Sequence, residues 1–179
     1  CGLMLMGNIQ LTSNRLPQSP RYFDALPVYF RESALLDRFH CFIEGWYLPR
    51  INKSMIYKGW TINVEYFSEI LHALRTENSY GLLFDDLVVY DKKADMRDFK
   101  AVKKIATAAM KLLFPHWRSI EDVNFDDFDT YCLQPAIARR GIVKEQCHNI
   151  DPEFSTQMLD IRVKVQPSGK FENESNWTL

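Results

Sequence analysis

The sequence predicts an α+β protein that is mainly helical. From about residue 61 to 150, apolar side chains recur at helical spacing, which predicts a series of amphipathic helices. Strands are predicted in only two places, near the start of the chain and near residue 160. With 179 residues, 46% of them hydrophobic and 25% charged, the chain is long enough for one globular domain, or for one and a fraction.

Charge and cysteine content exclude several classes of protein. The formal net charge of -1 provides no global basic field, so any binding of nucleic acid would have to be local. Cys1, Cys41, Cys132 and Cys147 are scattered without a C-x-x-C pair, which predicts reduced thiols in a cytoplasmic protein. The four histidines are equally scattered, so no metal cluster is expected. No apolar run approaches the roughly 18 residues of a membrane span, and we expect no membrane contact.

The first residues predict a buried strand. Residues 3 to 6, Leu-Met-Leu-Met, form a continuous apolar run that ends at Gly7-Asn8, a pattern typical of a parallel sheet. Ligands of such sheets lie at the carboxyl ends of the strands, where the amide of Asn8 could both donate and accept hydrogen bonds. A plain turn at Gly7-Asn8 is the alternative. Because Cys1 opens this run with no cap or turn before it, we expect a piece of a longer protein.

An arginine follows the next predicted helix. A proline-containing loop over residues 11 to 27 and a short helix over residues 28 to 36 lead into Asp37-Arg38. An Arg at the end of a buried element has little freedom, which suits an Arg that must reach a phosphate on a neighbouring molecule. The alternative is that Arg38 is a surface charge that pairs with Asp37 or Glu44.

Two amphipathic helices are predicted in the middle of the chain. Thr61 is expected to cap a helix that runs to about Arg75, and Asp95 a helix that runs to about Phe114. Each of them carries a single apolar stripe. Between them, residues 80 to 91 predict a short helix or an irregular packed segment.

Four lysines lie largely off the apolar stripe of the second of these helices. A basic face like this could meet nucleic acid, although such faces are more often simply solvated. The residues are Lys100, Lys103, Lys104 and Lys111.

The last predicted helix carries two adjacent arginines. It follows the acidic residues 119 to 129, which suit a helix N-terminus, and runs to about Ile150 with Pro135 kinking or dividing it. A calcium loop is the alternative for the acidic stretch, but the spacing lacks the Gly and the terminal Glu of that motif. Arg139 and Arg140 point about 100° apart, so one can lie near a packed groove while the other meets water.

The end of the chain offers no nucleotide-binding or protease motif. Residues 160 to 165 alternate apolar and charged, which predicts a half-exposed strand, and the polar tail 166 to 179 is typical of a linker. The chain contains neither a phosphate loop nor a G-x-S-x-G elbow, and Ser168 near Lys170 is interpreted as a turn. On its own, the chain is therefore not expected to bind ATP or to cut peptides.

Several of these segments together resemble AAA+ ATPases. In chain order they are the apolar run that ends at Gly7-Asn8, the proline-rich loop, LLDRFH, EGWYLPRI and ARRGIVKEQ. More closely, residues 1 to about 154 resemble the ATP-dependent Lon-type proteases, the Lon-like component of bacterial BREX phage-defence systems. The chain departs from that family at Glu44, where members commonly have Pro, at Pro135, and at Gly141, where the motif's second Arg would fall.

The resemblance implies roles for four residues. Asn8 matches the sensor 1 position, which orients the attacking water. Arg38 matches the arginine finger, which acts in trans on ATP held by the adjacent subunit and stabilises transition-state charge on the transferring phosphoryl group. Arg140 matches the sensor 2 Arg, which contacts the ATP phosphate within its own subunit, and Arg139 is the alternative.

The resemblance also implies an architecture and a function. Residues 1–50 would be the C-terminal end of an AAA+ α/β core, residues 51–154 a helical lid subdomain, and residues 155–179 a strand and linker toward a further domain, protease-like in Lon-type proteins. The parent would be a cytoplasmic ring of identical subunits that uses ATP and Mg²⁺ to remodel or degrade protein, or to act on DNA in phage defence. The chain alone would hold no nucleotide, and its arginine finger would be idle. The alternative is a helical DNA- or protein-binding module that uses the basic helix face.

Overall fold

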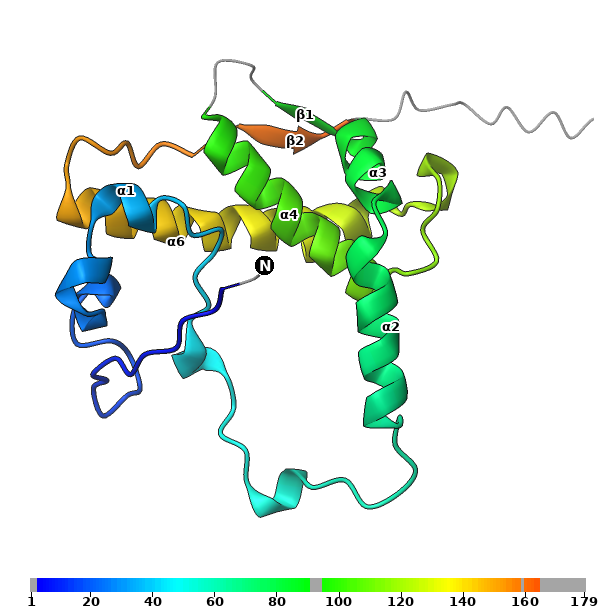
Figure 1. Cartoon of the computed structure of the whole chain (residues 1–179), viewed down its shortest axis with the longest axis horizontal. Helices are drawn as coiled ribbons and strands as arrows, with labels where there is room; N and C mark the ends of the chain where they lie inside the picture. Colours follow the sequence, from blue (N-terminus) through cyan, green and yellow to red (C-terminus); the bar gives the residue numbers. More distant parts are fainter. Residues whose placement is uncertain (1–2, 91–94, 159, 165–179) are drawn as a thin grey trace, which may run out of the picture.

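The computed structural model describes residues 3 to 90, 95 to 158 and 160 to 164. The expectations for Cys1 and for the tail 166 to 179 lie outside these residues. The described chain is mainly helical with one two-stranded sheet, which confirms the α+β class (Figure 1). No helix within these ranges is both long and apolar enough to cross a membrane.

The larger hydrophobic core lies between α3 (Ser79–Leu87), α4 (Met96–Leu113) and α6 (Gln134–Ile150), and α4 crosses α6 (Figure 1). The sequence predicted α4 with its cap, and of the two alternatives for residues 80 to 91 the structure shows the short helix over most of the segment. The Asp95 carboxylate accepts a hydrogen bond from the Arg97 amide at 2.8 Å. Side chains that this core buries include Tyr80, Phe84, Leu87, Val102, Ala106, Met110, Trp117, Phe128 and Leu133.

A continuous helical stretch leads into α6. After the short η5 (Ile120–Asp122), it passes from α5 (Phe125–Asp127) through η6 (Phe128–Leu133), which is a π-helix, and becomes α-helical at Gln134. Pro135 lies in the first turn of α6, where its missing N–H costs little. The predicted helix to Ile150 is confirmed, and the change from π-helix to α-helix at Gln134 falls beside Pro135, where a kink or a division was predicted.

The sheet joins two segments that are far apart in sequence. β1 (Val88–Tyr90) pairs antiparallel with β2 (Ile161–Val163), and Val88 lies opposite Val163. The half-exposed strand predicted from residue 160 is confirmed over its described residues, because Ile161 is buried and Arg162 is exposed.

A second, smaller core holds the N-terminal part of the chain against α6. Its elements are η1 (Tyr22–Ala25), η2 (Val28–Phe30) and α1 (Ser33–Leu36). The single helix predicted over residues 28 to 36 is wrong, because Glu32 is extended, with φ -69° and ψ 122°, and separates η2 from α1. The buried side chains of this core are Phe23, Leu36, Val143 and Cys147.

The buried strand predicted for residues 3 to 6 is also wrong. The segment is irregular, and Leu3, Met4 and Met6 are all at least 75% exposed. A parallel strand needs neighbouring strands to complete its hydrogen bonds, and the described residues place no strand beside this segment. An apolar run in the sequence does not show whether neighbouring strands are present.

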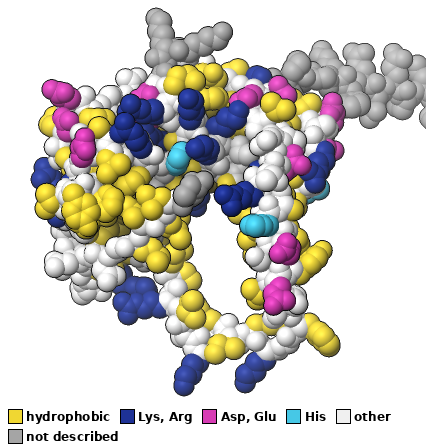
Figure 2. Space-filling model, viewed as in Figure 1, with side chains coloured by type: hydrophobic (Ala, Val, Ile, Leu, Met, Phe, Trp, Pro, Cys, Tyr) yellow, Lys and Arg dark blue, Asp and Glu magenta, His cyan; other side chains and the backbone are white. Residues whose placement is uncertain are grey.

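Residues 48 to 63 arch away from the rest of the molecule and leave an opening that is visible in the space-filling view (Figures 1 and 2). This region follows η3 (Gly45–Tyr47), includes η4 (Lys53–Met55) and leads into α2 (Val64–Thr76). Asn63 caps α2, rather than the predicted Thr61, because its side chain accepts from the Glu65 amide at 2.8 Å. No residue of α2 is buried, so the predicted apolar stripe is present but unpacked.

Candidate functional site

The segment Asp37-Arg38-Phe39 follows directly after α1 and lies against α4 and α6. Leu36 is fully buried in the smaller core, which fixes the end of α1 on α6. Asp37 continues in helical conformation and its side chain is only 7% exposed, whereas Arg38 is exposed to solvent. One buried and one exposed charge therefore stand next to each other in the chain.

Asp37 accepts hydrogen bonds from two arginines on the helices. Its Oδ1 lies 2.6 Å from Arg140 Nη2 and its Oδ2 lies 2.5 Å from Arg97 Nη1. Burial alone would raise the pKa of Asp37, but the hydrogen bonds and charges of Arg97 and Arg140 outweigh burial and hold the pKa below its ordinary value. Asp37 is therefore an anion at neutral pH.

Arg140 is 1% exposed, and four of its N–H groups donate to protein acceptors. Besides Asp37, its Nε donates to Asp98 Oδ1 at 2.8 Å. Its Nη1 donates to the backbone carbonyls of Asp37 and Phe39, at 2.9 Å and 2.6 Å. The planar guanidinium thus joins α6, α4 and the segment after α1 at a single point.

Lys144 is the second buried cation beside Asp98. Lys144, one helical turn after Arg140, donates to Asp98 Oδ2 at 2.5 Å. Asp98 is 1% exposed and is bound by two cations of α6, Arg140 and Lys144. A buried ion pair of this kind is retained only when its partners are fully matched, since removal of one partner costs about 3–5 kcal/mol. We call Asp37, Arg97, Asp98, Arg140 and Lys144 the buried charge network.

His40 lies beside the network, at the surface. Its Nε2 is 3.0 Å from Lys104 Nζ and accepts this hydrogen bond, because an ammonium group can only donate. Burial, Lys104 and Arg140 all lower the pKa of His40. On the face shown in Figure 2, Lys and Arg side chains gather around a histidine above the opening.

The exposed side chain of Arg38 folds back onto its own helix, where it donates to the carbonyl of Ala34. This carbonyl is one of those that the end of a short helix leaves without a backbone partner. The contact is local and solvent-exposed, so a stronger acceptor such as a phosphate could replace it. The alternative pairing of Arg38 with Asp37 or Glu44 is not found among the described ion pairs.

The four predicted site residues are only partly brought together. Arg140 contacts the backbone on both sides of Arg38, whereas Arg139 is exposed and its carbonyl accepts from the Phe42 amide at 3.3 Å. Asn8 is exposed in the irregular N-terminal segment and shares no hydrogen bond with these arginines in the described chain. The roles of these residues toward ATP stay predictions.

Three members of the network are not singled out by the sequence motifs: Arg97, Asp98 and Lys144. A usable signal was present for two of them. Asp98 precedes Val102 by four residues, which places it on the apolar stripe of α4, and Lys144 follows Arg140 by four on α6. A charged residue on an otherwise apolar stripe indicates a buried ion pair, because Asp and Lys are almost never fully buried without partners.

The basic face of α4 is largely engaged within the protein. Lys103 pairs with Asp85 at 2.5 Å, Lys111 donates to the carbonyl of Leu74 at 2.7 Å, and Lys104 contacts His40. Only Lys100 of the four has no such contact among the described residues. A nucleic-acid interface here stays a prediction, which salt-dependent DNA binding would test.

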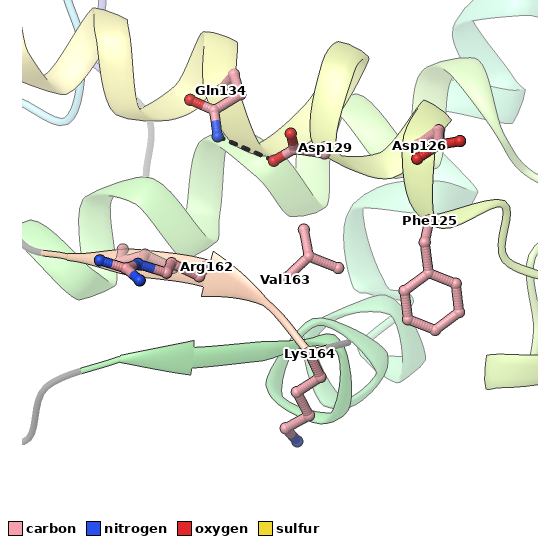
Figure 3. A pocket seen from close by; sticks show the side chains of 8 residues that line it. Phe125, Asp126, Asp129, Gln134, Arg162, Val163 and Lys164 are labelled. Carbon is pink, nitrogen blue, oxygen red and sulfur yellow. Dashed lines mark hydrogen bonds between the residues drawn. The ribbon is translucent and has the colours of Figure 1, made fainter. Parts of the chain in front are cut away.

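A separate cavity of about 490 Å³ lies between β2 and the helical stretch before α6 (Figure 3). Several of its polar side chains already have partners: Gln134 donates to Asp129 at 2.9 Å, and Arg162 pairs with Asp160 at 2.7 Å. It shares no residue with the buried charge network. In the described ranges, no group of three or more His, Cys, Asp or Glu residues could hold a metal ion.

The α+β fold and the arginine-centred site define a mainly helical domain that presents one arginine beside a buried charge network. Residues 1–160 match the family described as "Lon-like protease BrxL-like, ATPase domain", and the chain belongs to this family. The resemblance to Lon-type proteins of phage-defence systems is thereby confirmed.

Two curated relatives bear the name Lon-like protease BrxL. One, from Escherichia coli O9:H4 (strain HS), is 26% identical over 145 residues, which are 80% of this chain and 20% of the relative. The other, from Bacillus cereus (strain H3081.97), is 28% identical over 150 residues, which are 83% of this chain and 21% of the relative. The chain thus spans about a fifth of the length of the curated relatives it matches.

Proposed function

We propose that this chain is the C-terminal part of the AAA+ module of a ring-forming ATPase in bacterial phage defence. Residues 1–50 finish the nucleotide-binding core, residues 51–154 form the lid, and residues 155–179 lead toward a further domain. Membership of an ATPase-domain family supports the proposal. The observation that carries it is the solvent-exposed Arg38, held two residues after the fully buried Leu36 and next to the buried Asp37.

In this proposal Arg38 acts on ATP bound by the adjacent subunit. Its guanidinium stabilises the charge that develops on the transferring phosphoryl group, while Mg²⁺ bound with ATP neutralises the phosphate oxygens. Arg38 must first release the carbonyl of Ala34, which a charged phosphate oxygen can displace. Asn8 orients the attacking water.

Of the two lid arginines, Arg139 has the side chain that solvent reaches, whereas Arg140 is held by Asp37 and Asp98. We therefore assign the phosphate contact within the subunit to Arg139 first, with Arg140 as the alternative that the family motif favours. The free thiols of Cys41, Cys132 and Cys147 agree with a reducing, cytoplasmic compartment. Hydrolysis would drive remodelling or degradation of protein, or an action on DNA.

Substitution of Arg38 tests the proposal in the natural protein that carries this chain. Arg38→Ala should lower the ATP turnover rate by about 10³-fold or more and leave nucleotide affinity nearly unchanged, because the finger acts on the transition state. Steady-state hydrolysis and equilibrium binding of a fluorescent ATP analogue measure the two effects. Arg162→Ala is the matched control, since the Arg162 side chain is also exposed and, among the described residues, its hydrogen bonds go to Asp160.

A mixing experiment tests the action in trans. Arg38→Ala subunits still bind ATP, and subunits with an inactivated phosphate loop still carry Arg38. A mixture of the two should recover part of the activity that neither variant shows alone. Full turnover by the Arg38→Ala variant on its own would contradict the proposal, and the 179-residue chain alone should hydrolyse no ATP.

A further inference from the structure

The two carbonyls that Arg140 binds stand on either side of Arg38. Arg140 Nη1 donates both of its hydrogens, one to the carbonyl of Asp37 and one to that of Phe39. The same guanidinium binds the Asp37 side chain through Nη2. Arg140 therefore holds the backbone before Arg38 and the backbone after it, but makes no contact with the Arg38 side chain.

Arg140 is itself fixed from the opposite side. Asp98 on α4 accepts from its Nε, and Lys144 binds the second oxygen of the same carboxylate. Every one of these side chains is at most 10% exposed, so water screens the contacts little. The position of Arg38 thus follows the relative placement of α4 and α6.

We infer that Arg140 is a positioning residue for Arg38. By binding both flanking carbonyls, it fixes the point and direction from which the finger leaves the surface, and the loss of that orientation lowers the rate without any change in how ATP binds. The inference rests on the proposed function of Arg38. It also explains why an arginine is needed, because a lysine ammonium cannot span two carbonyls and two carboxylates in one plane.

The variant Arg140→Lys tests the inference, because it keeps the positive charge between Asp37 and Asp98 but loses the double contact with the carbonyls. In the natural protein we expect kcat to fall at least 10-fold with KM for ATP within twofold of the unmodified value. Single-turnover experiments measure the low rate of ATP hydrolysis in this variant. Arg162→Lys, at an exposed ion pair, is the matched control and should leave both constants unchanged.

A double variant separates positioning from an independent role. If Arg140 acts through Arg38, Arg140→Lys should cause little further loss once Arg38 is replaced by Ala, because no finger remains to be positioned. A rate that falls by the same factor in both backgrounds would overturn the inference. A raised KM with an intact kcat would overturn it as well, and would assign Arg140 to the nucleotide phosphate.

Hydrogen exchange tests, independently of ATPase activity, whether Arg140 holds the backbone around Arg38. The amides of Arg38 and Phe39 donate to the carbonyls of Leu35 and Leu36, at 3.1 Å and 2.9 Å. In the 179-residue chain, Arg140→Lys should speed exchange at these two amides at least 10-fold while the amides of α3 keep their protection. Unchanged exchange would overturn the inference even if Arg38 proves to be the finger. Conversely, faster exchange together with an active Arg38→Ala variant would refute only the proposed function.

A second variant covers the case in which Arg140→Lys does not fold. Asp98→Asn keeps a carbonyl oxygen for Arg140 Nε but removes the charge that anchors it. We expect the same pattern with a smaller loss of kcat. A variant that is folded by circular dichroism and retains full kcat would count against the inference.

Discussion

Asp37 makes the stability of the chain depend on pH in the acid range. Its pKa in the folded state is lowered by Arg97 and Arg140 despite burial, whereas an unfolded Asp has a pKa of about 3.9. The folded state therefore favours the ionised form, and this contribution is fully present above about pH 4 and is lost as the pH falls through the folded pKa.

Urea unfolding of the unmodified chain and of Asp37→Asn between pH 2 and pH 7 measures this contribution. At pH 7, Asp37→Asn should lower the free energy of unfolding by about 3 kcal/mol, because Arg140 loses one of its two buried carboxylate partners. Below pH 4 the difference should shrink. Asp160→Asn, at an exposed ion pair, should change little at any pH, and a constant difference for Asp37→Asn across the range would contradict the assignment.

At the scale of residues, the sequence alone singled out Arg38 and Arg140 but not the relation between them. The order of motifs implied a nucleotide contact for each of them, in different subunits, whereas the contact of Arg140 with Asp98 depends on how α4 crosses α6. Spacing along one helix shows which side chains share a face, but it does not show which face of another helix they meet. Arg97 left no signal of this kind, since its side chain is half exposed.

At the scale of elements, two caps of the same chemistry should differ in their effect. Asp95 caps α4, which is packed in the larger core, and Asn63 caps α2, of which no residue is buried. Asp95→Ala should lower the global free energy of unfolding by about 1 kcal/mol. Asn63→Ala should reduce helicity but leave the global free energy nearly unchanged, because a 13-residue helix without packing is marginal by itself.

Chemical unfolding monitored by tryptophan fluorescence gives the global free energy, and amide exchange within α2 gives the local one. If Asp95→Ala and Asn63→Ala lowered the global free energy of unfolding equally, α2 would unfold together with the core.

The same contrast explains which elements the sequence could predict. The span and cap of α4 were predictable, because its cap and apolar stripe agree with each other and with the packing. Residues 3 to 6 and the stripe of α2 carry equally strong apolar patterns, yet neither is buried among the described residues. The spacing of apolar residues predicts which face of a helix or strand can be buried. Whether that face is buried depends on a neighbouring element, which the spacing does not show.

At the scale of the whole molecule, the two cores share α6, and Leu36 links the N-terminal part to that helix. Leu36 is fully buried with Val143 and Cys147. Leu36→Ala should cost about 2–5 kcal/mol and should also loosen the segment around Arg38. Leu112→Ala, on the exposed side of α4, is the control and should cost less than about 0.5 kcal/mol.

Calorimetry measures the stability that Leu36→Ala removes, and proteolysis measures the loosening of the segment around Arg38. Early cleavage between residues 22 and 42, with α3 and α4 still protected, is the expected pattern. A single cooperative loss of the whole chain, with no such early cleavage, would show that the smaller core is not a separate unit of stability.

The separation between the backbone and the side chain of residue 38 makes this position suitable for a spectroscopic reporter. Arg140 holds the backbone on both sides of residue 38 through the carbonyls of Asp37 and Phe39. The Arg38 side chain takes no part in these contacts and, within the described chain, donates only to the carbonyl of Ala34. Cys132 and Cys147 are buried, and burial raises the pKa of their thiols to about 12 and about 11, so they would compete poorly for a thiol-directed label. With Cys1 and Cys41 replaced, a spin label at Arg38→Cys would leave the surface at a defined point. In the ring that we propose, distances between labels would report the subunit spacing with little added uncertainty from the main chain.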